Sequence, residues 1–249
     1  EAVVGVLNDT GTLYIVRWDG SASSWTQLGS NIATGINPAV TKIFDINYEN
    51  TSGDAVVVVG GGVDPLYYTW NGSTWVGPTT ITQATRTTGA IRWVETAVRK
   101  TSGSDELALA YADANGDLNA LIWSGSAWTE QTAVGTALST GIENNAAATT
   151  MRAFDVKYET VSGDLLIMWG NSATVDPRYV TRTAAGAWSA VLTATTFVEI
   201  PSIMNMAAEP WGDRIAVGLQ NDTTANSNDG DCGIWNGSAW VNTVNCDVA

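Results

Sequence analysis

The chain has no histidine and only two cysteines. Without histidine it cannot form a Ser-His-Asp or Cys-His catalytic group, and it cannot form a histidine-ligated metal site. Two cysteines alone cannot complete a structural zinc site. No run of about 18 apolar residues occurs, so we expect no membrane insertion.

Charged residues are also scarce, at 14% against about 25% in an average soluble protein. Most are acidic, since 25 Asp and Glu against 11 Lys and Arg give a net charge of −14. A surface this acidic repels phosphate backbones and anionic lipids, so we expect no nucleic-acid partner. Threonine, serine, asparagine and glycine take the place of charged residues, and this composition favours strands and turns over helices.

One motif recurs along the sequence: a strand-like segment, a turn of small residues, and a tryptophan. Its copies end at intervals of 50, 53, 60 and 52 residues, at Trp25, Trp75, Trp128, Trp188 and Trp240. All but the Trp188 copy carry a tryptophan on both sides of the turn. The sequence is therefore an internal repeat, and a period near 50 residues decides which folds to consider.

A second element precedes the motif in every unit except the first. Phe44–Glu49 alternates apolar and polar residues, Thr51–Asp54 has turn composition, and Ala55–Val59 is a continuous apolar run. Phe154–Glu159 begins the same arrangement, and weaker copies begin near Trp93 and Ile203. Each full unit therefore reads as four strands joined by hairpins.

Four-stranded units in tandem are typical of a β-propeller. We predict an all-β fold with almost no helix, in which residues 1–249 form a single domain. The domain is expected to be a five-bladed β-propeller of four-stranded antiparallel blades around a central channel. The blades are expected at approximately residues 1–36, 37–88, 89–141, 142–196 and 197–249.

The first blade is predicted to lack its first strand. Glu1–Leu7 aligns with Asp54–Val58, which opens the second strand of its unit, and only nine residues follow Trp240. Three interpretations stay open: the first blade has three strands, the chain belongs to a longer protein, or a neighbouring subunit supplies the strand. The last would allow self-assembly through the incomplete blade, because an open sheet edge can pair with a foreign strand.

The two cysteines lie on either side of the last tryptophan hairpin. Antiparallel pairing across that hairpin places Cys232 near residue 243, within short reach of Cys246. We therefore expect a disulfide, which fits an oxidising compartment and a secreted or cell-surface location. Two buried free thiols are the alternative.

The tryptophan pairs are the candidate binding residues. A turn centred on Gly72 and Ser73 places Trp70 opposite Trp75, whereas a turn at Asn71 and Gly72 places Tyr68 there. The rings either pack between blades or stack on sugar rings. In the second case the binding residues are Trp70, Trp75, Trp123, Trp128, Trp235 and Trp240.

Three carboxylates are candidate channel residues. Asp45, Glu95 and Asp155 each lie eight residues before a turn glycine, on the strand expected to line the channel. Paired carboxylates can serve as acid and base or nucleophile in glycoside hydrolysis. These acids recur with the repeat, however, and recurrence favours a structural role such as capping turns or holding a cation.

Two loops are further candidate sites. Asp113–Asp117 resembles the start of a calcium loop, but Ser124 stands where an EF-hand needs glutamate, and Asn115-Gly116 is also a common hairpin turn. We expect no cofactor, with Ca²⁺ as the alternative. Asn221–Asp231 is longer than its counterparts and is either a functional or mobile insertion or simply a tolerated one.

The Trp-x-Gly-x-x-Trp hairpins, Ser-Gly-Asp turns and five units resemble secreted β-propeller repeat proteins, loosely the tachylectin-type five-bladed lectins and the Asp-box propellers. The Asp-box pattern Ser-x-Asp-x-Gly-x-Thr-Trp is not kept, since Asn71–Trp75 lacks its aspartate. The resemblance therefore transfers neither sialidase activity nor a sugar specificity to named residues.

These observations predict a non-enzymatic extracellular binding module. Its partner is a glycan or a surface protein, recognised through weak repeated sites that act together, as in adhesion. The first alternative is a structural subunit of a surface filament or layer, completed by a strand from a neighbouring subunit. The second is a glycoside hydrolase that uses the channel carboxylates.

Overall fold

The structure is a computed structural model that describes residues 1–28, 32–34, 36, 42–60, 62–84, 89–142, 151–171, 174–197, 201–220 and 230–246. Every regular element within these ranges is a β-strand, as the composition predicted. The described part of the chain contains no helix long and apolar enough to cross a bilayer. The candidate insertion at Asn221–Asp231 falls mostly outside the described residues.

The strands form five antiparallel sheets, which we name A to E in chain order. Sheet A contains β1 (Ala2–Leu7), β2 (Leu13–Asp19) and β3 (Ser24–Gln27). Sheet B contains β4 (Phe44–Tyr48), β5 (Ala55–Val59), β6 (Leu66–Trp70) and β7 (Trp75–Thr80). Sheet C contains β8 (Ile91–Val98), β9 (Leu107–Asp113), β10 (Leu118–Trp123) and β11 (Trp128–Glu130).

Sheet D contains β12 (Phe154–Tyr158), β13 (Leu165–Asn171), β14 (Thr174–Arg182) and β15 (Leu192–Thr193). Sheet E contains β16 (Ile203–Ala208), β17 (Ile215–Gln220), β18 (Gly230–Trp235) and β19 (Trp240–Asn245). Within each sheet the strands follow chain order, so each sheet is a meander of hairpins.

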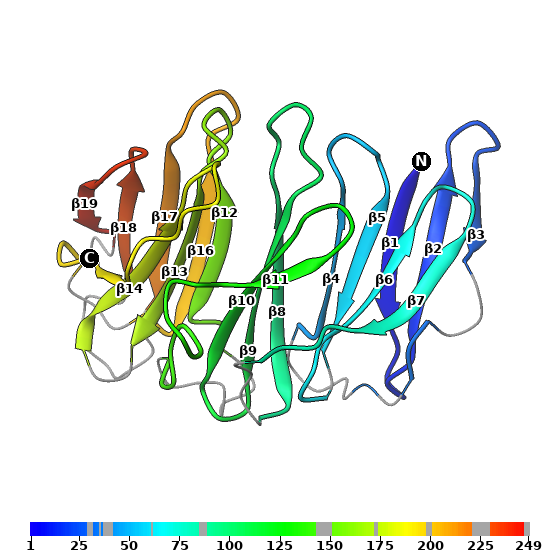
Figure 1. The fold of residues 1–249 in the computed structure, drawn as a ribbon, viewed down its shortest axis with the longest axis horizontal. Helices are drawn as coiled ribbons and strands as arrows, with labels where there is room; N and C mark the ends of the chain where they lie inside the picture. Colours follow the sequence, from blue (N-terminus) through cyan, green and yellow to red (C-terminus); the bar gives the residue numbers. More distant parts are fainter. Residues whose placement is uncertain are drawn as a thin grey trace.

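The sheets stand side by side in one array (Figure 1). The first strands of sheets B to E, β4, β8, β12 and β16, contact one another in succession, and β1 of sheet A contacts β4. Sheets A and E lie at opposite ends of the array (Figure 1), and each named strand pairs only within its own sheet. The chain therefore forms five sheets in an open array, and strand pairing does not close it into the ring that the repeat predicted.

Sheet A has three strands, as predicted for an incomplete first unit. Its β2–β3 hairpin aligns Trp18 with Trp25, just as the β6–β7 hairpin aligns Trp70 with Trp75. Strand β1 begins opposite Trp18, as β5 begins opposite Trp70. The strand that sheet A lacks is therefore the counterpart of β4.

Apolar side chains fill the four spaces between neighbouring sheets. In β5, Val57 and Val59 face sheet A, whereas Val56 and Val58 face sheet C, and all four are buried. A strand covered on both faces needs no polar alternation, which explains the continuous valine run in the sequence. The same arrangement recurs between sheets C and D and between sheets D and E.

The hairpins use glycines with left-handed backbone. Gly53 and Gly163 of the Ser-Gly-Asp turns have φ of 76° and 73°, a conformation that disfavours residues with a Cβ atom. In the tryptophan hairpins the Asn71 and Asn236 side chains accept hydrogen bonds from the backbone N–H groups two and three residues later. These local bonds fix the short turns that align the two tryptophans.

The predicted disulfide is present between Cys232 and Cys246, whose Cα atoms lie 5.8 Å apart. Cys232 pairs with Val244, because an irregularity in the β18–β19 ladder shifts the register beyond Ile234. The bridge therefore ties the end of β19 to its own sheet, at the C-terminal end of the array.

Candidate functional site on the inner strands

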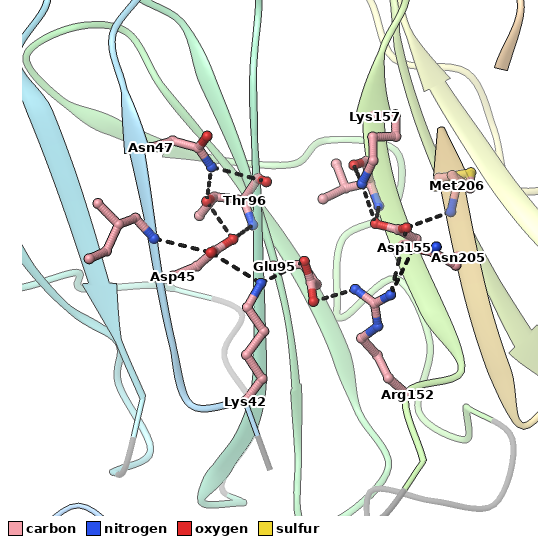
Figure 2. A network of polar contacts seen from close by, with 12 residues as sticks. Lys42, Asp45, Asn47, Glu95, Thr96, Arg152, Asp155, Lys157, Asn205 and Met206 are labelled. Carbon is pink, nitrogen blue, oxygen red and sulfur yellow. Dashed lines mark hydrogen bonds and ion pairs between the residues drawn. The ribbon is translucent and has the colours of Figure 1, made fainter. Parts of the chain in front are cut away.

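The three candidate channel acids occupy one structural position in three successive sheets. Asp45 on β4 lies opposite Val58, Glu95 on β8 opposite Ala110, and Asp155 on β12 opposite Met168. Asn205 holds this position on β16, opposite Gly218. Figure 2 shows these side chains across the contacting inner strands.

Two of the acids join neighbouring sheets. The Asp45 carboxylate accepts hydrogen bonds from the backbone N–H and the hydroxyl of Thr96 on sheet C, both at 2.8 Å. The Asp155 carboxylate accepts a hydrogen bond of 2.7 Å from the backbone N–H of Met206 on sheet E. Each carboxylate thus binds the inner strand of the next sheet, where no ladder of strand pairing connects the two sheets.

Glu95 differs because it binds two side chains from residues that come just before the neighbouring strands β4 and β12 in the sequence. Its carboxylate accepts a 2.9 Å hydrogen bond from the Lys42 ammonium and forms an ion pair with the Arg152 guanidinium. Lys42 also pairs with Asp45, and Arg152 lies 3.8 Å from the Asp155 carboxylate. The acids therefore belong to a network of alternating charges (Figure 2) rather than to a ring of negative charge.

The contacts of this network fit a role in joining neighbouring sheets better than a role in hydrolysing a sugar. A glycosidase needs one carboxyl group that carries a proton and another that reaches the sugar. Asp155 is fully buried and accepts bonds from Val156 N–H, Lys157 and Met206 N–H, while Glu95 lies between two cations. These donors occupy the carboxylate oxygens that a substrate would need.

A small cleft opens beside this network, at the ends of the inner strands. Its volume is about 270 Å³, and its polar wall includes Asn47, Thr96, Lys100, Lys157 and Glu159. Asn47 and Lys157 lie at the end of the network opposite Lys42 and Arg152 (Figure 2). Ala97, Val98 and Ala208 add an apolar part to the wall. Ammonium, amide and hydroxyl groups beside an apolar surface can bind a small polyhydroxylated ring.

Three of the four tryptophan pairs lie in the seams between sheets, and the Trp18–Trp25 pair lies on the outer face of sheet A. The rings of each pair are 5.3–5.5 Å apart, in the pairs Trp18–Trp25, Trp70–Trp75, Trp123–Trp128 and Trp235–Trp240. The first tryptophan of the last three pairs is 4% exposed, and the second is half-buried. This confirms the register with Trp70 opposite Trp75, and it leaves the faces of the first tryptophans in contact with protein.

The indole N–H groups of Trp70, Trp123 and Trp235 donate to carboxylates that lie outside the predicted site residues. The indole N–H of Trp123 donates to Glu49 at 2.5 Å, and that of Trp235 donates to Glu159 at 2.6 Å. The indole N–H of Trp70 donates to Glu1 at 3.1 Å. Each bond joins one sheet to the next. We call this recurring contact the seam bond.

The seam between sheets C and D has a different seam bond. Arg182 occupies the position of the first tryptophan, and its guanidinium donates to Glu106 at 2.9 Å. The Glu106 carboxylate also accepts a 2.9 Å hydrogen bond from Tyr158 of sheet D. Arg182 in turn lies 5.9 Å from the ring centre of Trp188. The degenerate fourth copy of the motif thus keeps the contact and changes its chemistry.

Spacing in the sequence is the one feature that could have pointed to Glu49 and Glu159 as inter-sheet residues. Glu49 and Glu159 each follow a channel acid by four residues, but no partner can be assigned to a lone carboxylate from spacing alone. Their partners lie more than 70 residues further along the chain.

Burial raises the pKa of the Glu49 and Glu159 carboxyls above the ordinary value of about 4.3. The folded state then keeps protons that the unfolded state releases, so their stabilising contribution is lost as pH rises through the raised pKa. We expect Glu49→Gln/Glu159→Gln to gain stability relative to the parent as pH rises from about 4 towards neutral. Urea unfolding at several pH values measures this, and a difference that stays constant or falls with pH would contradict it.

The calcium-like loop is a hairpin turn between β9 and β10. The Asp113 carboxylate accepts hydrogen bonds from the backbone N–H groups of Asn115, Asp117 and Gly89, at 2.8, 3.0 and 3.0 Å. Among the described residues, no group of three or more Asp, Glu or Cys side chains is arranged to hold a metal ion.

Comparison with solved structures identifies the type of fold. BP39L lectin from Burkholderia pseudomallei matches with a TM-score of 0.65 at 14% identity, over 99% of this chain and 65% of the lectin. The lectin of Aleuria aurantia, a six-bladed β-propeller described with a novel mode of fucose recognition, matches with a TM-score of 0.53 at 14% identity, over 99% and 75%. The chain therefore has a β-propeller-type fold and spans about two thirds of the length of BP39L.

A sialidase also shares this likeness. NanB from Streptococcus pneumoniae matches with a TM-score of 0.53 at 10% identity, over 85% of this chain and 33% of the enzyme. No protein-family model and no curated protein sequence matches the chain. The likeness supports the resemblance to propeller proteins at the level of fold, without singling out tachylectin-type or Asp-box propellers.

Proposed function

We propose that this protein is a non-enzymatic carbohydrate-binding module and that the cleft at the ends of the inner strands takes the sugar. The observation that carries the proposal is the polar wall of this cleft on a fold shared with propeller lectins. The acids beside the cleft are occupied by donors from the protein itself, which supports a binding role over hydrolysis.

Lys100 and Lys157 place positive charge at the cleft of a chain that is acidic as a whole. The chain has three lysines and a net charge of −14, and two of the three line this cleft. Lys157 is anchored by the Asp155 carboxylate, whereas Lys100 is exposed at the rim. A glycan hydroxyl or carboxylate can accept hydrogen bonds from these ammonium groups, while the Asn47 side chain offers a neutral acceptor.

The tryptophan pairs have a supporting part in this proposal. The rings of Trp70, Trp123 and Trp235 are packed and their N–H groups donate to carboxylates. These three pairs therefore keep neighbouring sheets in register and hold the inner strands that form the cleft. The disulfide fits an oxidising compartment, which agrees with action outside the cell.

A glycan array followed by calorimetric titration of the hits tests the proposal. We expect Lys100→Met to weaken binding of a hit about tenfold, because a charge-assisted hydrogen bond contributes roughly 1.5–3 kcal/mol. Arg214→Met is the matched control: it removes one exposed positive charge on sheet E, outside the cleft, and should leave affinity unchanged. An array without hits, or hits that bind Lys100→Met and the parent equally well, would refute the assignment.

A further inference from the structure

At each end of the array, one residue occupies a seam-bond position without forming a seam bond: Trp18 in sheet A and Glu209 in sheet E. Trp18 holds the position of Trp70 in sheet A, but no carboxylate of the described residues accepts a bond from its indole N–H. Glu209 holds the position of Glu49 and Glu159 in sheet E, since all three donate their backbone N–H to the residue five positions later. Among the described residues, its carboxylate pairs with the exposed Arg214 of its own hairpin and with no residue of another sheet.

The outer face of sheet A carries bulky apolar side chains that elsewhere lie in a seam. Val4 and Val6 correspond to Val57 and Val59, which are fully buried against the preceding sheet. On sheet A they are 41% and 49% exposed, and Trp25 of the neighbouring hairpin is 58% exposed. This face, which we call the bulky end face, is formed by Ala2, Val4, Val6, Tyr14, Val16, Trp18 and Trp25.

The outer face of sheet E carries small side chains. Ala207, Ala216 and Gly218 are exposed there, with Ile234 and Val241 beside them. Two adjoining hollows of about 340 and 430 Å³ run over this surface, which we call the small end face. Its counterpart in sheet C is lined by Ala108, Ala110 and Ala112, which are completely buried under sheet D.

The seam between sheets C and D shows how two such faces fit. There the alanines of β9 leave room for the large side chains of the following sheet, including Phe154 and Trp169. The two end faces therefore have the same relation as the faces of an existing seam, with small residues on one side and large ones on the other. They point away from each other at opposite ends of the array (Figure 1), so they cannot meet within this one chain as it stands.

We propose that the bulky end face of one copy of this chain docks on the small end face of a second copy, which continues the array from sheet E to sheet A. In this contact the indole N–H of Trp18 donates to Glu209 of the second copy, and Arg214 balances the carboxylate charge. The interface is heterologous, since each copy uses two different surfaces. It therefore builds head-to-tail assemblies that grow with concentration. Because each copy carries fourteen net negative charges, added salt should strengthen the association.

Complementation between two blocked variants tests this geometry. Val4→Lys/Val6→Lys blocks the bulky end face, and Ala207→Lys/Ala216→Lys blocks the small one. All four side chains are exposed, so the fold should persist, and the circular dichroism and melting temperature of each variant check this. In analytical ultracentrifugation we expect the parent to form concentration-dependent oligomers and each variant alone to stay monomeric. An equimolar mixture should form a one-to-one dimer and nothing larger, because one intact face of each kind remains.

Controls separate the interface from general stickiness. Val76→Lys removes an exposed hydrophobic side chain, at 59%, from β7 of sheet B, away from both end faces, and should leave association unchanged. Trp18→Phe and Glu209→Gln should each weaken it several-fold, and the double variant should be no weaker than the worse single one. A parent that stays monomeric at all concentrations and salt levels would overturn the proposal. So would a mixture of blocked variants that fails to associate.

Discussion

Replacing Asp155 by alanine is expected to lower the free energy of unfolding by about 3–5 kcal/mol, the range for breaking a buried charged network. Its carboxylate is fully buried and joins sheets D and E through the 2.7 Å bond from Met206 N–H. Alanine would leave that N–H and the N–H of Val156 buried without an acceptor. Urea unfolding followed by tryptophan fluorescence measures the loss.

Asp45→Ala is the matched comparison. Asp45 makes the same contact between sheets B and C, but 17% of its side-chain surface is accessible. In Asp45→Ala, water can therefore replace part of the lost hydrogen bonding to Thr96. We expect a loss of roughly half that of Asp155→Ala. Equal losses, or a larger one for Asp45, would show that burial does not decide the strength of these inter-sheet bonds.

Trp123→Phe is expected to destabilise the protein by about 1–3 kcal/mol more than Trp128→Phe, although the two rings lie 5.3 Å apart in one hairpin. The indole N–H of Trp123 donates to the buried Glu49 carboxylate. The indole N–H of Trp128 is buried and has no hydrogen-bond partner among the residues that the structure describes, so its removal costs only packing. Chemical unfolding of the two variants side by side gives the difference.

The Trp235 and Trp240 pair repeats this comparison independently. Trp235 donates to Glu159, whereas the N–H of Trp240 is buried and finds no partner within the described ranges. A second readout follows from the same bond: losing a donor should raise the pKa of Glu49 further in Trp123→Phe. If both members of each pair proved equally costly to replace, ring packing alone would account for the repeat of tryptophans.

The repeat allowed most of the local structure to be predicted. Strand alternation, glycine turns and a fixed spacing act within some twenty residues, so Phe44–Glu49, the valine run and the tryptophan hairpin could each be placed from their own sequence. The disulfide followed from hairpin pairing, although Cys232 lies opposite Val244 rather than residue 243. The cause is an irregularity in the β18–β19 ladder, and composition gives no sign of it.

The contacts between sheets could not be predicted in this way. Glu49 with Trp123 and Asp155 with Met206 join residues that are distant in sequence and meet only when two sheets pack. The same holds for the cations: Lys42 and Arg152 convert the expected acidic ring into a network of alternating charge. Closure is likewise a property of the packing angles between all five sheets, and the repeat count alone does not determine it.

The seam bonds at the four seams differ in how strongly dissolved salt weakens them. Three are closed by an indole donating to a carboxylate, and the fourth by the Arg182 guanidinium on Glu106. Dissolved ions weaken the attraction between two opposite charges far more than a bond whose donor is neutral. Among these four seam bonds, dissolved ions therefore weaken the one between sheets C and D most. This joint divides the molecule into a three-sheet part and a two-sheet part, each with its own uninterrupted set of indole bonds.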